Sequence, residues 1–107
     1  MAQFTFEDAR QAYYHGDKVD TDKLLLDCVT AATTVDELVW VFQTTFDEGP
    51  SRGVRSAALT KAVELSRTAA DARRVYPLAT RRLKGRTRYV WPKVAKLAEE
   101  KLTPLLA

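Results

Sequence analysis

Apolar residues recur three or four positions apart along almost the whole chain, and this spacing constrains the fold more than any other feature. No segment shows the strict alternation of apolar and polar residues that a β-strand requires. Glycines, prolines and threonines punctuate the pattern. We therefore expect an all-α fold, and the pattern predicts six helices, near residues 5–15, 20–32, 35–47, 53–66, 69–84 and 88–102. Because the connections are short, neighbouring helices should lie antiparallel.

Length and composition limit the class of protein. A chain of 107 residues, 46% of them hydrophobic, can bury one modest core, so residues 1–107 are expected to form a single domain. The longest apolar run, residues 38–42, falls far short of the roughly 20 residues that cross a bilayer. No transmembrane segment is expected.

Residues suited to catalysis or metal binding are scarce. The single cysteine, Cys28, excludes an internal disulfide, and together with the single histidine, His15, it cannot furnish a zinc site. No serine, cysteine or acid has an evident catalytic relation to His15, and no glycine-rich phosphate loop is present. We predict no catalytic residue, no bound cofactor or metal, and no small-molecule substrate.

Some of the apolar positions repeat as a unit. The pair Leu25 and Val29 recurs 34 residues later as Leu59 and Val63, and each pair precedes an apolar-then-aromatic pair by 13 residues. Similar spacing follows from any amphipathic helix, which is the simpler alternative. With the matching pair in the first helix, the predicted repeat core is Ala9, Tyr13, Leu25, Val29, Leu38, Phe42, Leu59, Val63, Ala72 and Tyr76.

A 34-residue helix–turn–helix unit resembles those of the tetratricopeptide and pentatricopeptide repeat families. The resemblance implies helical hairpins stacked into a right-handed α-α superhelix. In the pentatricopeptide family, certain helix positions read RNA bases with small polar side chains. Aligned on Leu25 and Leu59, those positions hold apolar residues here, such as Leu24 and Ala58, which disfavours sequence-specific RNA reading.

Charge is divided unevenly along the chain. Residues 1–50 hold 3 basic and 10 acidic side chains, a net charge of −7, whereas residues 51–107 hold 14 basic and 4 acidic, a net charge of +10. An anionic partner for the second half, or contacts between oppositely charged neighbours, would explain this asymmetry.

The positive charge is concentrated in residues 71–88, DARRVYPLATRRLKGRTR. On a continuous helix its arginines would share one exposed face, opposite Ala72, Val75 and Tyr76. This basic ridge could bind nucleic acid or an acidic protein surface equally well on charge alone, or it could be a solvated face. It comprises Arg73, Arg74, Arg81, Arg82, Lys84, Arg86 and Arg88.

Two aromatic residues follow the ridge. Tyr89 and Trp91 could stack on RNA bases, or they could be core residues beside Val90 and Val94. Pro77 and Pro92 each follow an aromatic residue, and each predicts either a kink or the start of a new helix.

Three segments are also similar to the cytochrome c oxidase subunit Va family. The opening FEDARQAYYHGDKVDTDKL is similar in its Asp-Ala-Arg, its tyrosines and its Val-Asp helix start. Residues 57–83 resemble an Ala-Ala-Leu helix followed by an Ala-x-Arg helix, and YVWPKVAKLAEEKL, residues 89–102, resembles the last helix of that subunit. Residues 34–49 depart from the family pattern, as an additional helix.

The subunit Va resemblance implies a non-catalytic subunit without haem or copper, docked on the matrix side of the mitochondrial inner membrane. Our leading interpretation is therefore a structural subunit of a respiratory complex, bound to other protein subunits. The alternative is a helical-repeat RNA-binding or ribonucleoprotein component that uses the basic ridge. A general protein-binding adaptor is the third, and a cytoplasmic location is the alternative to a mitochondrial one.

Overall fold

A computed structural model describes residues 5–15, 21–47, 52–82 and 88–106. These residues form six α-helices and no strand: α1 (Phe6–His15), α2 (Thr21–Ala31), α3 (Val35–Asp47), α4 (Arg52–Leu65), α5 (Ala69–Ala79) and α6 (Pro92–Leu106). The prediction of an all-α fold with six helices is confirmed.

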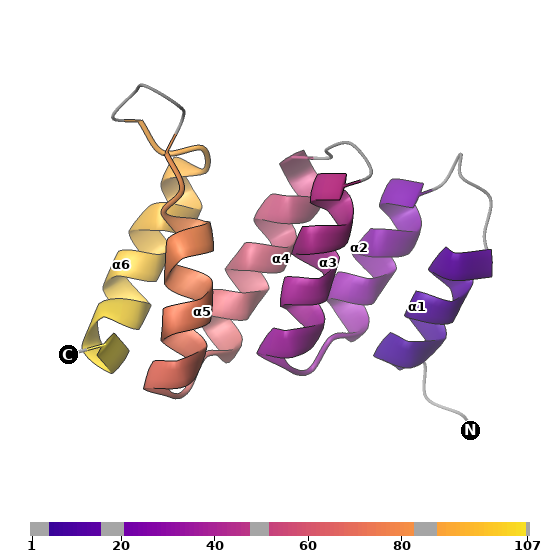
Figure 1. The fold of residues 1–107 in the computed structure, drawn as a ribbon, viewed down its shortest axis with the longest axis horizontal. Coiled ribbons are helices and arrows are strands. Elements are labelled where there is room, and N and C mark those ends of the chain that lie inside the picture. The colour runs from indigo at the N-terminus through magenta and orange to yellow at the C-terminus, as the bar shows by residue number, and fades with distance from the viewer. Residues whose placement is uncertain (1–4, 16–20, 48–51, 83–87, 107) are drawn as a thin grey trace.

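The helices stand side by side in a flat array (Figure 1), which measures 41 × 33 × 17 Å along its principal axes. Consecutive helices make three closely packed pairs, α1 with α2, α3 with α4, and α5 with α6. Helix α4 also contacts both α2 and α6, and α3 contacts α5. Helix α4 is therefore the centre of the array, with contacts to four other helices.

The helix ends recur along the chain. A threonine hydroxyl accepts a hydrogen bond from the amide three residues later at the start of α1, α3 and α5, through Thr5, Thr34 and Thr68. Side-chain oxygens at such positions satisfy amides that lack an intrahelical acceptor. Thr34 and Thr68 stand 34 residues apart. The ends of α2 and α4 match at the same spacing, because the amides of Ala32 and Ser66 both bond to carbonyls three and four residues earlier.

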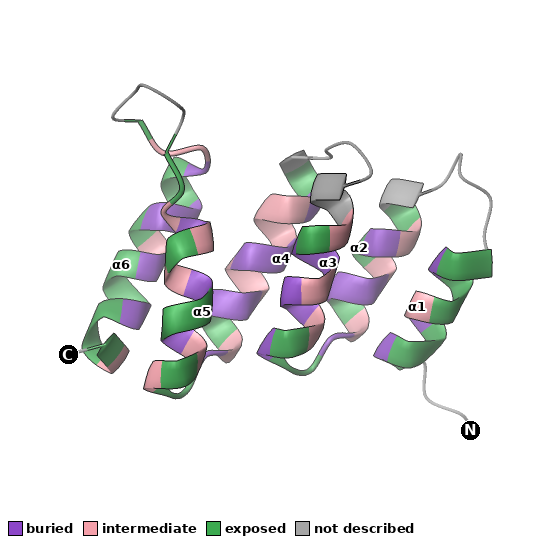
Figure 2. Cartoon of the chain, in the orientation of Figure 1, coloured by how far each residue is buried: buried purple, intermediate pink, exposed green. Residues whose placement is uncertain are grey.

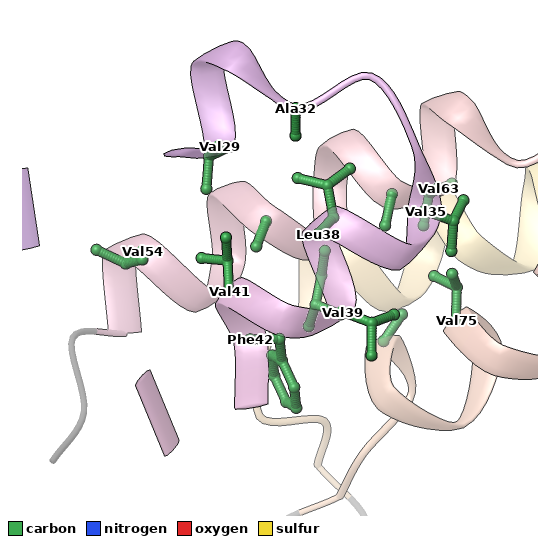
Figure 3. Close-up of a cluster of buried hydrophobic side chains, with 14 of the residues drawn as sticks. Val29, Ala32, Val35, Leu38, Val39, Val41, Phe42, Val54, Val63 and Val75 are labelled. Carbon is green, nitrogen blue, oxygen red and sulfur yellow. The ribbon is translucent and has the colours of Figure 1, made fainter. Parts of the chain in front are cut away.

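The core lies along the faces where the helices meet. Figure 2 shows buried positions alternating with exposed ones along the outer helices, as expected for amphipathic helices, whereas residues 54–63 of the central α4 are all buried or half-buried. In Figure 3 the buried side chains of α3 lie against those of α2, α4 and α5. Of the ten positions in the predicted repeat core, all but Tyr76 are buried, and Tyr76 is half-buried against the same cluster.

Helix α5 is shorter than the sequence pattern predicted. It ends at Ala79, whereas the periodicity predicted a helix to residue 84. The amide and the hydroxyl of Thr80 both bond to the carbonyl of Tyr76, at 3.0 and 2.7 Å, and close the last turn. The chain then pairs with a later segment, since the amide of Val90 donates to the carbonyl of Arg81 at 2.9 Å. This pairing replaces the continuation of the helix.

Helix α6 begins and ends later than predicted. It begins at Pro92 rather than near residue 88, because a proline disfavours helical geometry in the residue before it and suits the first helical position. Of the two alternatives expected at Pro92, a kink or the start of a new helix, the structure shows the start of a helix. At the other end α6 continues past residue 102 and through Pro104 to Leu106, with Leu105 packed against the core.

Candidate partner-binding surface

Two cations of the predicted basic ridge lie on α5. Arg73 and Arg74 are both exposed, while Ala72 and Val75 on the opposite face are fully buried. Arg74 forms an ion pair with Asp36 in the first turn of α3. The charge of Arg74 is therefore already paired within the chain.

The next two cations lie beyond the helix. Because α5 ends at Ala79, Arg81 and Arg82 do not continue the helical face of Arg73 and Arg74, and the single ridge along one helix is wrong. Arg88 is exposed, whereas Lys84 and Arg86 lie outside the described residues.

Arg82 is held against an aromatic ring. It forms an antiparallel bridge with Tyr89, and its guanidinium carbon lies 4.8 Å from the centroid of that ring. The Tyr89 hydroxyl donates a hydrogen bond to Glu99 of α6 at 2.7 Å, and this bond raises the pKa of the phenol. These contacts join the segment after α5 to the exposed side of α6. They also engage the ring of Tyr89, which the sequence analysis considered as a surface for base stacking.

Trp91, the second aromatic candidate, belongs to the core. Only 6% of it is exposed, and its ring meets that of Phe42 in α3 with centroids 5.9 Å apart and planes at 70°. A base could not stack on it without displacing the core. The core alternative is thus the correct one for Trp91.

One cation of this surface escaped the sequence analysis. Arg55 lies in the first turns of α4. The positive charge of Arg81 disfavours the charged form of the Arg55 guanidinium. Burial, and to a smaller extent the charge of Arg81, lowers the pKa of the Arg55 guanidinium. The only signal in the sequence was the general excess of positive charge after residue 50, because the position of Arg81 relative to Arg55 depends on where α5 ends.

A groove opens beside these cations. Its described walls are Gly53 and Ser56 of α4 and residues 90–94, which enter α6, and its volume is about 440 Å³. The lining is largely apolar and includes one cation, Lys93. No residue of the groove apart from Trp91 was singled out by sequence reasoning as a binding residue.

A separate aromatic cluster joins α1 to α3. The ring of Trp40 meets those of Phe6, Tyr13 and Tyr14 at centroid distances of 5.7, 5.9 and 6.0 Å. The Arg10 guanidinium lies 5.7 Å from the centroid of Trp40. These contacts pack α1 against α3, whereas the other contacts of α1 are chiefly with α2.

The remaining candidates stand apart from this surface. His15 is exposed in the last turn of α1, and Cys28 is buried in α2, where desolvation raises the pKa of its thiol to about 11. Within the described ranges, no three His, Cys, Asp or Glu side chains gather as metal ligands do. In the same ranges, no helix has the length and apolar character to cross a membrane.

Comparison with known proteins adds no relative: the chain matches no protein-family model, no curated protein and no solved structure. The resemblances to helical-repeat families and to cytochrome c oxidase subunit Va therefore stay predictions.

Proposed function

We propose that this chain is a non-catalytic docking subunit that holds an acidic protein neighbour on the side of α5 and α6. The observation that carries the proposal is the exposure of cations on three successive segments of the chain. Arg73 on α5, Arg81 and Arg88 on the paired segments after it, and Lys93 on α6 are all exposed. Among the described residues, Arg73 and Arg88 have no ion-pair partner.

A repeat array suits such a role. We propose that the three hairpins form a right-handed, tetratricopeptide-like stack, in which the even-numbered helices make one layer and the odd-numbered ones the other. The contacts of α4 with α2 and α6, and the 34-residue recurrence of helix caps, support this arrangement. Such stacks present wide surfaces formed by several helices, as binding to a protein neighbour requires.

The resemblance to subunit Va suggests which assembly to test first. We propose a respiratory complex of the mitochondrial inner membrane, with this chain on the matrix side, as the first candidate. A tagged copy should then co-purify with an intact membrane complex. Recovery of the tagged chain alone, under conditions that keep such complexes together, would contradict the docking role.

Charge reversal tests the surface. The double variant Arg73→Glu, Arg88→Glu should lose the partner, because two carboxylates would then repel an acidic neighbour. The matched single variants Arg88→Glu and Lys23→Glu change the net charge equally, the second at an exposed position of α2, away from α5 and α6. Equal loss in both variants would point to net charge rather than to this surface.

An RNA-binding role is the alternative. It draws on the same cations, but Tyr89 and Trp91 are engaged in intramolecular contacts and offer little for base stacking. A labelled single-stranded oligonucleotide should show no appreciable affinity at low salt. Binding that weakens steeply as salt is added would replace the protein-docking proposal with the RNA one.

A further inference from the structure

The groove beside α4 and α6 has the form of a peptide site. Gly53 and Ser56 stand in the first turns of α4, and residues 90–94 contain the start of α6. Both helices begin at the same edge of the array (Figure 1). The missing side chain of Gly53 leaves room on one wall, while Val90 and Val94 make the other apolar.

One polar group in the groove lining lacks a partner. Trp91 is more than nine-tenths buried, and its indole Nε1 is shielded from solvent with no hydrogen-bond acceptor in the described part of the chain. A buried donor in this state is destabilising, and buried polar groups in proteins are almost always paired. At the same wall, the amides of Lys93 and Val94 open α6 and have no acceptor within the helix. The two amides favour a ligand that brings oxygen acceptors.

The charge around the groove has one sign. Lys93 belongs to the lining and is exposed. The carbonyl of Arg81 accepts a hydrogen bond from the amide of Val90. The positive charge of Arg81 also disfavours the charged form of Arg55. No acid is found among the described residues of the lining. Lys93 therefore offers a positive charge to an anionic ligand in the groove.

We propose that this groove binds a short acidic segment of a partner protein, with one aliphatic side chain between Gly53 and Val94 and carboxylates on the surrounding cations. The proposal rests on the docking function and names its binding site. A nucleobase fits less well, because the walls are aliphatic and Trp91 presents only 6% of its surface.

Nuclear magnetic resonance of the folded chain can test the site. The probe is an acetylated, amidated peptide with a central leucine flanked by aspartates. It should bind with a dissociation constant below about 1 mM at low salt and should shift the indole N–H resonance of Trp91. The resonance of Trp40, the other tryptophan, should stay in place because its ring packs against α1. A peptide with asparagines in place of the aspartates should bind at least about tenfold more weakly.

Two substitutions check the position. Gly53→Leu fills the groove with a residue that favours a helix more than glycine does, so it should reduce affinity at least about tenfold without unfolding the chain. Its control, Ala70→Leu, adds the same side chain at an exposed position of α5. No saturable shift of the Trp91 resonance, or equal weakening by both variants, would overturn the proposal. Binding of a single-stranded oligonucleotide in the groove, competing with the peptide, would overturn it as well.

The two proposals fail in distinguishable ways. If the peptide does not bind while co-purification persists and depends on Arg73 and Arg88, the docking function stands and the groove is not its site. If the peptide binds as described but no complex is recovered, the groove is a peptide site and the docking function is wrong.

Discussion

Lys61 links two hairpins through a contact that can be tested alone. It lies on α4, and its Nζ donates hydrogen bonds to the carbonyls of Val29 and Thr30 at 2.7 and 2.8 Å. These carbonyls belong to the last turn of α2, which has no basic residue of its own. The ammonium therefore bonds to two carbonyls at the end of α2 and places a cation at the negative end of the α2 dipole.

The structure sets the size of the effect. A hydrogen bond to a charged group contributes about 1.5–3 kcal/mol, but the carbonyl of Thr30 is exposed and can bond to water instead. The carbonyl of Val29 also keeps the amide of Ala32 as a partner at 3.3 Å. For Lys61→Met, which retains an unbranched apolar side chain, we expect a loss of about 1.5 kcal/mol in the free energy of unfolding. The corresponding decrease in Tm is about 6 °C.

Urea unfolding followed by circular dichroism measures this loss. The midpoint should fall while the m-value stays constant, because the native contacts elsewhere are unchanged. Lys101→Met, at an exposed position of α6, is the control and should cost less than about 0.5 kcal/mol. If Lys61→Met costs no more than the control, the ammonium does not hold α2 to α4 and the reasoning is refuted.

Three further changes test local features. Thr68→Ala removes the hydroxyl that accepts from the amide of Asp71 and should lower the free energy of unfolding by about 1 kcal/mol in the same urea assay. The Cys28 thiol should resist a disulfide reagent at pH 8 until the chain unfolds, because burial raises its pKa from 9.0 to about 11. Since the unfolded thiol loses its proton first, stability should fall as pH rises from 9.0 to about 11, and Cys28→Ala should remove that dependence. Glu99→Gln should lower the pKa of the Tyr89 phenol, read from its ring resonances during an alkaline titration, because Glu99 is the main cause of the rise.

The sequence predicted the helices well where local signals and packing agree. The threonine caps at residues 34 and 68 begin helices one residue later, as expected, and the apolar spacing from Leu38 to Phe42 places both residues in the core. Both signals depend on residues only a few positions apart. The prediction failed at the end of α5, where Thr80 and the pairing of Arg81 with Val90 override the helical pattern.

The surface was less accessible to sequence reasoning. The cations of residues 73–88 were evident in the sequence. Their predicted arrangement was wrong because α5 ends at Ala79 and not at residue 84. Arg55 and Gly53 come from a different helix, and only the parallel packing of α4 with α6 brings them to the same edge as Lys93. A pattern within one segment cannot reveal a groove made by two.

The division of charge bears on how a partner would arrive. The first and last helices lie at opposite ends of an array 41 Å long (Figure 1), so the described residues of the acidic and basic halves lie toward opposite ends, and the halves meet where α3 packs on α4. The Debye length at physiological salt is only about 8 Å, so charges at one end are largely screened from the other. An approaching acidic protein would be attracted at α5 and α6 and repelled at α1 and α2. Orientation would then be selected before any contact forms, and added salt should slow association more than it speeds dissociation.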